Sequence, residues 1–222
     1  MIDPTALIDG PSALIVGGGT LLATMLRCGL ADCGMTITKL GQLPRAGFDF
    51  DRTRAELALQ IQEIQRDGLL RATPHHSGDA EFDAAADALI ERRSVAGLLD
   101  AHQAHHARRL AESERAVQTL VQAAELAPVF GLAGTLVSLS QLPTESVARG
   151  AFTAAIAMAV ITTLYGLLAA NLLLAPLARM IERKAQAEEA QRERLIEWLA
   201  AQVELAVALR NGRTAHPLEQ PA

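Results

Sequence analysis

The chain has 222 residues, of which 50% are hydrophobic and 3% aromatic, and its formal net charge is −5. Its mean hydropathy of +0.19 is high for a water-soluble domain of this size, and the apolar residues gather in long runs. The acidic balance and the lack of a basic block argue against a nucleic-acid partner, because phosphates attract clustered Lys and Arg.

Three apolar stretches are long enough to cross a membrane as helices, which takes roughly 17 to 25 residues. We expect spans over residues 11–31, 126–142 and 150–178. Arg27 lies near the end of the first stretch, where its long side chain can reach the membrane surface. The predicted fold is an all-α integral membrane protein with three transmembrane helices and long helical cytoplasmic extensions.

Basic residues are unevenly distributed around these spans. Residues 1–10 contain none, and the connector 143–149 contains only Arg149. Lys39, Arg45, Arg179, Arg183 and Lys184 follow the first and third spans. The positive-inside rule therefore puts residues 1–10 and 143–149 outside, and residues 32–125, 179–212 and 213–222 in the cytoplasm.

The cytoplasmic parts have helical periodicity. We expect one helix that ends near Gly68, a loop over residues 73–79, and a second helix over residues 80–94. A third helix follows and continues into the second span. After the third span an amphipathic helix over residues 179–212 is expected to stop at Asn211 and Gly212, leaving residues 213–222 as a flexible tail. We expect no separate soluble domain, only extensions of the membrane helices.

The third span carries a stripe of small residues that recurs every three or four positions: Ala155, Ala159, Thr163, Gly166 and Ala170. Such a stripe lets membrane helices approach closely. Two interpretations of Thr162 and Thr163 remain open. Each hydroxyl can bond a carbonyl of its own helix, or the two can line a narrow polar path with Thr135 and Ser138 of the second span.

Other candidate sites are weaker. His102, His105 and His106 share a helical face and could hold a metal ion, but the sequence shows no nearby Cys and no clear acidic third ligand. We therefore interpret them as a solvated helix surface rather than a metal site. Cys28 and Cys33 are expected to be reduced thiols. The sequence contains no catalytic constellation, and we expect neither an enzyme nor a cofactor.

The membrane motifs resemble a known family. "ELAPVFGLAGTLVSLSQL" and "ITTLYGLLAANLLLAPLARMIERK" are similar to the last two membrane helices of MotA-type flagellar stator subunits, within the MotA/TolQ/ExbB proton-channel superfamily. "PSALIVGGGTLLAT" resembles the second membrane helix of MotA, and "EIQRDGLLRA" resembles a short Gly-Leu-Leu element of its cytoplasmic region. The Thr-Thr-Leu-Tyr-Gly run followed by Ala-Asn favours the MotA branch over TolQ and ExbB.

The resemblance implies a mechanism. Such subunits form a homo-oligomer, a pentamer, in the lipid of the bacterial inner membrane, here with a periplasmic N-terminus. The ring surrounds a MotB-like single-span partner that supplies a membrane Asp for the coupling ion. The carried-over residues are Thr135, Thr162 and Thr163 on the ion pathway, and Pro128 and Pro176 as coupling hinges. These helices contain no acid of their own, so the partner must bring the titrating group.

Two departures from the MotA pattern leave alternatives open. MotA-type chains have four membrane helices, and this sequence begins where their second would start, so we expect either an absent first helix or a three-span variant. Arg66 lies near the Gly-Leu-Leu element, but "RATP" takes the expected acidic position, which leaves a cytoplasmic rotor contact open. The alternatives are a TolQ/ExbB-like subunit with a TolR/ExbD/TonB-like partner, or a non-conducting membrane scaffold.

Overall fold

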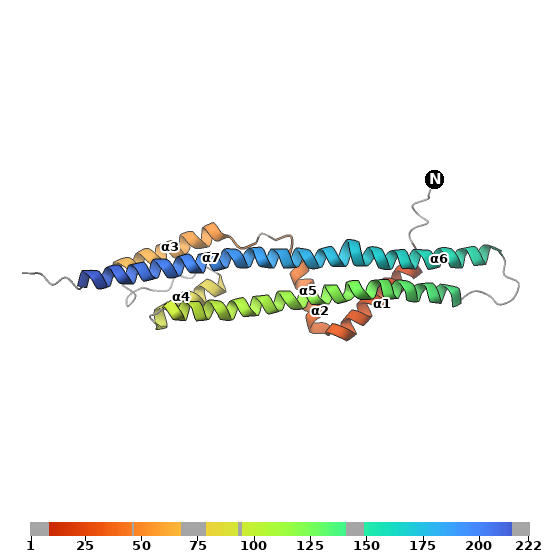
Figure 1. Ribbon diagram of the computed structural model, residues 1–222, viewed down its shortest axis with the longest axis horizontal. Helices are drawn as coiled ribbons and strands as arrows, with labels where there is room; N and C mark the ends of the chain where they lie inside the picture. Colours follow the sequence, from red (N-terminus) through yellow and green to blue (C-terminus); the bar gives the residue numbers. More distant parts are fainter. Residues whose placement is uncertain (1–8, 46, 68–78, 93–94, 141–148, 215–222) are drawn as a thin grey trace, which may run out of the picture. The chain divides into compact units, whose positions relative to one another are not determined.

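The computed structural model describes residues 9–45, 47–67, 79–92, 95–140 and 149–214. Every regular element within these residues is a helix (Figure 1), which confirms the predicted all-α fold. Two compact units contain them, and we describe each by itself. Unit 1 comprises Met1–Arg45 and Glu112–Arg183, and unit 2 comprises Ala46–Ala111 and Lys184–Ala222.

Three helices of the described part of the chain are long and apolar enough to cross a membrane, as the sequence predicts. The first is α1 (Gly10–Cys28), and the second lies within α5 (Val95–Ser140). The third begins in α6 (Arg149–Leu168) and passes through a π-helical segment, η2 (Ala169–Leu174), into α7 (Ala175–Thr214). The 46 residues of α5 are about 69 Å long against a hydrocarbon core of about 30 Å, so this helix extends well beyond the membrane.

The N-terminal helix pair of unit 1 is defined by a cap and a glycine. The carboxylate of Asp9 accepts the backbone N–H of Ser12 at 3.0 Å, which caps α1. The helix ends at Gly29, whose φ of +88° and ψ of +159° only glycine adopts readily. The chain then changes direction into α2 (Leu30–Gln42), as Figure 1 shows. This break lies inside residues 11–31, which the sequence predicts as one uninterrupted span.

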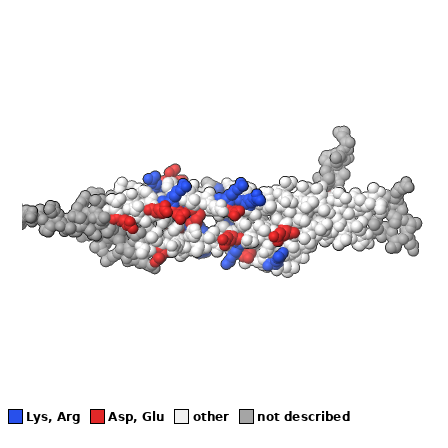
Figure 2. Space-filling view, viewed as in Figure 1, with Lys and Arg blue, Asp and Glu red and all other residues white. Residues whose placement is uncertain are grey.

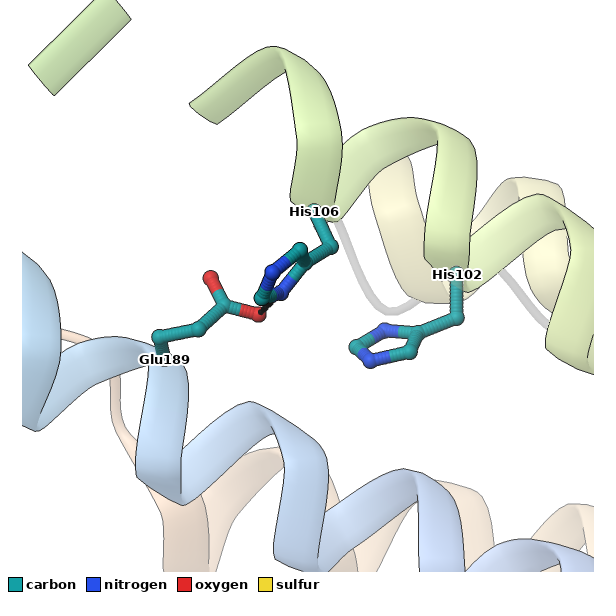
Figure 3. A group of neighbouring side chains, drawn as sticks. All are labelled: His102, His106 and Glu189. Atoms are coloured by element: carbon teal, nitrogen blue, oxygen red, sulfur yellow. Dashed lines mark hydrogen bonds and ion pairs between the residues drawn. The ribbon is translucent and has the colours of Figure 1, made fainter. Parts of the chain in front are cut away.

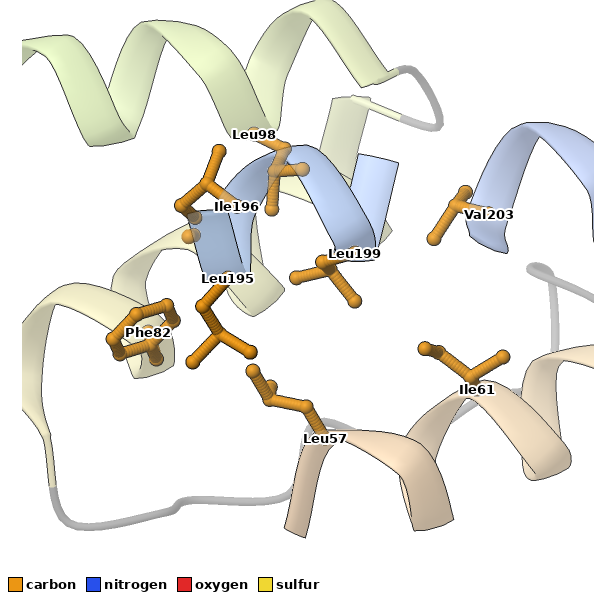
Figure 4. Close-up of a cluster of buried hydrophobic side chains, with 9 residues drawn as sticks. Leu57, Ile61, Phe82, Leu98, Leu195, Ile196, Leu199 and Val203 are labelled. Carbon is orange, nitrogen blue, oxygen red and sulfur yellow. The ribbon is translucent and has the colours of Figure 1, made fainter. Parts of the chain in front are cut away.

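Unit 2 has a hydrophobic core of its own, which includes parts of the long helical extensions that the sequence predicts. Parts of α5 and α7 pack there with α3 (Phe50–Asp67) and α4 (Ala80–Arg92). The buried core residues, most of them labelled in Figure 4, are Leu57, Ile61, Phe82, Ala85, Leu98, Leu195, Ile196, Leu199 and Val203. The sequence did not predict this core, because the periodicity of one helix does not reveal which other helices cover its apolar face.

The end of α7 also differs from the sequence prediction. The helix does not stop at Asn211 and Gly212 but continues to Thr214. A glycine within a helix costs only about 1 kcal/mol relative to alanine, which does not by itself terminate a 40-residue helix. Most of the predicted tail 1–10, connector 143–149, tail 213–222 and loop 73–79 lies outside the described residues, which exclude 1–8, 68–78, 141–148 and 215–222.

Candidate functional site

Helices α5 and α6 approach each other closely in unit 1 through glycines. A methyl group placed on Gly166 of α6 would lie 2.6 Å from the carbonyl oxygen of Ala127 and 3.1 Å from Cα of Gly131. A methyl group on Gly131 of α5 would in turn lie 3.0 Å from the carbonyl oxygen of Thr162. The small-residue stripe therefore packs as predicted at Gly166, where the two backbones touch.

Thr162 belongs to this helix contact. Its side chain is fully buried, and a methyl group on Gly134 would lie 2.9 Å from its Cβ. The Thr162 hydroxyl lies within hydrogen-bond distance of two carbonyl oxygens of its own helix, Met158 at 3.1 Å and Ala159 at 2.9 Å. Thr162 thus fills the space that Gly134 leaves open on α5.

The other predicted hydroxyls also bond within their own helices. Thr163 donates to the carbonyl oxygen of Ala159 at 3.2 Å, and Thr135 donates to that of Leu132 at 2.6 Å. Thr163 and Thr135 are both partly exposed, whereas Ser138 is buried and donates to Gly134 at 2.8 Å. Each hydroxyl oxygen keeps acceptor lone pairs after donating its proton, so the exposed ones can still bind a cation or water.

The sequence interpretation missed a row of buried hydroxyls on α1. Ser12, Thr20 and Thr24 are buried at multiples of four residues, on the face of α1 that packs within unit 1. Thr24 donates to the carbonyl oxygen of Thr20 at 2.7 Å, while the Thr20 hydroxyl has no hydrogen-bond partner among the described atoms. The four-residue spacing is visible in the sequence and identifies this packed face.

Tyr165 has a role that the sequence does not reveal. Its phenolic oxygen accepts the backbone N–H of Asp9 at 3.0 Å, from a residue 156 positions away. Asp9 is the cap of α1, so this hydrogen bond connects the start of α1 to α6. Asn171 instead donates to the carbonyl oxygen of Leu167 on its own helix at 2.9 Å.

The two predicted hinge prolines lie in different local structures. Pro128 lies inside α5, which continues past it. Pro176 follows the π-helical segment, in which the Ala175 N–H bonds the carbonyl oxygen of Ala170, five residues back. A proline ring clashes with the carbonyl four residues before it, and a widened turn relieves such a clash. The position of Pro176 in the sequence predicts that the helix is distorted here, but it does not predict the π-turn.

A cluster of charged and imidazole side chains lies in unit 2, on α4, α5 and α7. Glu81, whose side chain is only 2% exposed, binds His102, Arg109 and Arg192. Burial alone would raise the pKa of Glu81. Hydrogen bonds from His102 and Arg109 and the charges of both arginines outweigh burial and lower the pKa to about 2. Glu81 is therefore ionised at neutral pH.

His102 and His106 belong to this cluster, which corrects their interpretation as a solvated surface. His102 is buried, and its Nδ1 lies 2.6 Å from Oε1 of Glu81. His106 lies on the same face of α5, and its Nδ1 is 2.6 Å from Oε1 of Glu189 on α7 (Figure 3). The interpretation failed because both carboxylates are distant in the sequence, 21 residues from His102 and 83 from His106.

Charged and uncharged side chains occupy different regions of the surface. On the face drawn in Figure 2, the Lys, Arg, Asp and Glu side chains of the described residues gather in one region, and a continuous area of uncharged residues lies beside it. In unit 1 many large apolar side chains of α1, α5 and α6 are exposed, among them Leu14, Leu22, Leu26, Leu132, Leu136 and Val160. Such faces suit lipid or neighbouring membrane helices. The Gly-Leu-Leu element considered for rotor contact lies outside the described residues.

Residues 75–194 match the sequence profile of the MotA/TolQ/ExbB proton channel family. Motility protein A of Aquifex aeolicus is 31% identical over 196 residues, covering 83% of this chain and 74% of that protein. Motility protein A of Cereibacter sphaeroides is 25% identical over 194 residues, covering 86% and 76%.

Two solved structures share the fold. The flagellar MotAB stator complex from Bacillus subtilis contains a chain that matches with a TM-score of 0.79 and 21% identity, over 90% of this chain and 80% of that one. The MotAB structure from C. jejuni matches with a TM-score of 0.81 and 17% identity, over 99% and 88%.

Proposed function

The chain belongs to the MotA/TolQ/ExbB proton channel family, and we propose that it works as the ring-forming subunit of a MotA-type stator. In this role it converts the ion gradient across the bacterial inner membrane into movement of a motility apparatus. The similarity to Motility protein A over most of the chain supports the MotA branch. The predicted topology of three spans with a periplasmic N-terminus is part of this proposal.

The observation that carries the proposal is the lack of an acid in helices that present hydroxyls. No Asp or Glu occurs in residues 126–142 or 150–178, where a carboxylate would cost about 2.5 to 3.5 kcal/mol on insertion. A proton that crosses the membrane along these two helices by binding a carboxylate therefore needs one that the helices do not supply. A MotB-like single-span partner with a membrane Asp meets this need, and the MotAB complexes of similar fold support it.

The structure suggests different roles for the three threonines. Thr163 and Thr135 are partly exposed in the single chain, so their hydroxyls are suited to face the partner and the ion path. Thr162 is fully buried against Gly134, so its contribution is to fix the distance between α5 and α6. Pro128 and Pro176 are the proposed points at which these helices transmit movement.

The driving energy is the membrane gradient, which amounts to about 2.3 kcal/mol per charge for each 100 mV. A proton that arrives on the partner's aspartate removes its charge and weakens its polar contacts with one position of the ring. Contact of the partner with the next position of the ring then becomes more favourable than contact with the first. The resemblance to the MotA type supports a pentameric ring, and the exposed apolar faces of unit 1 supply area for contacts with neighbouring subunits and lipid.

The test is ion flux in vesicles that contain the chain and its aspartate-bearing partner. We compare the unaltered chain with Thr163→Val, which removes the hydroxyl at nearly constant volume, and with Thr163→Ser, which keeps it. A hydrogen bond contributes about 1 kcal/mol, so the valine variant should conduct about fivefold less and the serine variant about as well as the unaltered chain.

Each outcome bears on a different part of the proposal. Equal flux in all three proteins would remove Thr163 from the ion path. No flux with an intact partner would instead favour the non-conducting scaffold. Activity only with a TolR- or TonB-like partner would assign the chain to the energy-transducing branch.

A further inference from the structure

The cluster in unit 2 has the ligands of a metal site. We propose that His102, His106 and Glu189 bind a divalent transition metal ion of the zinc class, independently of the proposed ion path. Imidazole nitrogen and carboxylate oxygen are ordinary zinc ligands, and two histidines with one glutamate are a known ligand set. A water molecule would complete a tetrahedral coordination.

The geometry brings the three ligands together from two helices. His102 and His106 are four residues apart on α5, which places both rings on one face of that helix. Glu189 reaches toward them from α7, as Figure 3 shows. One ligand atom from each residue lies within 4.8 Å of the other two. Ligands of a tetrahedral zinc ion are about 3.3 Å apart, so small side-chain rotations close the site.

Glu81 orients the His102 ring so that its Nε2 atom is available to a metal ion. The buried carboxylate of Glu81 is held by Arg109 and by Arg192, the latter at 2.6 Å, and its Oε1 lies 2.6 Å from Nδ1 of His102. An ionised carboxylate only accepts hydrogen bonds, so Nδ1 carries the proton and Nε2 presents its lone pair. Metal-binding histidines are commonly oriented by a carboxylate in this way.

Arg109 is compatible with a metal ion because Glu189 has two oxygens. Nε and Nη2 of Arg109 lie 3.1 Å and 3.0 Å from Oε2 of Glu189, whereas His106 approaches Oε1. A metal ion bound to Oε1 replaces the hydrogen bond between Glu189 and His106, together with the 2.9 Å contact from Nη2 to Oε1. The two contacts of Arg109 with Oε2 remain.

Exposure gives the ion a route to the site. The side chains of His106 and Glu189 are 40% and 21% exposed, whereas that of His102 is 11% exposed. An ion from solvent therefore meets His106 and Glu189 first and is then held by His102. The bound metal would link α5 to α7 within unit 2 and stabilise the folded state, because the unfolded chain does not hold these three residues together.

The experiment titrates the full chain in detergent with Co²⁺, whose visible spectrum distinguishes tetrahedral from octahedral coordination, and then displaces it with Zn²⁺. The unaltered chain should bind one Co²⁺ with a tetrahedral spectrum. His106→Ala and Glu189→Gln should each weaken binding by more than about 100-fold, since even an indirect partner of a ligand contributes 10- to 100-fold. His105→Ala is the matched control, because His105 is adjacent on α5 but outside the ligand group.

A second measurement separates binding from damage to the fold. Zinc should raise the unfolding temperature of the unaltered chain and of His105→Ala, but not that of His106→Ala, while all three remain equally helical without metal. The proposal is overturned if the cobalt spectrum is octahedral. It is also overturned if His105→Ala weakens binding as much as His106→Ala, because the ion would then bind surface histidines.

Discussion

The contact between α5 and α6 can be tested with one methyl group. In Gly166→Ala the added carbon would lie 2.6 Å from the carbonyl oxygen of Ala127 and 3.1 Å from Cα atoms of Gly131 and Pro128. These neighbours are backbone atoms, which cannot rotate away as a side chain does. The helices must therefore separate by a few tenths of an ångström or more.

The matched control is Gly18→Ala on α1. Gly18 is an exposed helical glycine, and apart from the local backbone of its own helix no atom lies within 4 Å of the added methyl. Both substitutions gain up to about 1 kcal/mol of helix propensity, but only Gly166→Ala meets overpacking, which costs about 1 to 3 kcal/mol. The difference between the two variants isolates this steric cost, and we expect it near 3 kcal/mol because the closest atom is a carbonyl oxygen.

The assay is reversible unfolding in mixed micelles with increasing denaturing detergent, followed by circular dichroism at a helix band. Gly166→Ala should unfold at lower detergent fraction than the unaltered chain, and Gly18→Ala at the same or a higher fraction. If Gly166→Ala is as stable as Gly18→Ala, the backbone contact at Gly166 does not limit the approach of these helices.

Two further substitutions probe buried charge and backbone conformation. Glu81→Gln removes the carboxylate that Arg109 and Arg192 share, although Arg109 keeps Glu189 and Arg192 keeps Asp79. It should destabilise unit 2 by about 1.5 to 3 kcal/mol, against less than about 1 kcal/mol for Glu56→Gln in the exposed pair with Arg52. The pKa of Glu81 is lowered, so its stabilising effect is complete above the unfolded pKa of about 4.3 and disappears as pH falls toward 2. In denaturant unfolding with a chelator present, the free energies of unfolding of the unaltered chain and of Glu81→Gln should therefore become equal as the pH falls through that range. Gly29→Ala should cost about 1 to 3 kcal/mol in the micelle assay because of its φ of +88°, whereas Gly34→Ala, helical and exposed, should cost nothing.

The helices of this protein could be predicted because their cause is local. Apolar runs indicate the three spans, and the helical periodicity before Gly68 agrees with α3, which the structure describes from Phe50 to Asp67. The absence of Gly and Pro after His102 likewise agrees with one helix that runs through α5 as far as Pro128. Each of these helices is determined by residues that lie close together in the sequence.

The polar cluster of unit 2 could not be predicted because its partners are remote. His102 and Glu81 are 21 residues apart, and Arg192 reaches Glu81 from 111 residues away. No periodicity within α5 indicates that a second helix brings a carboxylate to His106. The histidine spacing was visible, but its environment depends on how four helices pack in unit 2, and that arrangement is a property of the tertiary fold.

The π-turn before Pro176 shows how sequence spacing and helix geometry are reconciled. Buried or partly buried residues recur every four positions from Thr162 through Gly166, Ala170 and Leu174 to Ala178. Thr162 and Gly166 lie against α5, and Leu174 and Ala178 belong to a cluster with Ala116 and Leu120 of α5. A regular α-helix turns 100° per residue, so each four-residue step would move this face by about 40°, and four steps by about 160°. The packed face would then point away from its partner. Because a π-turn spans five residues instead of four, η2 takes up much of this rotation and lets one face remain buried across the junction. The proline explains why the helix departs from α geometry here, and the four-residue spacing explains why a widened turn, rather than a sharp kink, is the form that keeps the helix packed.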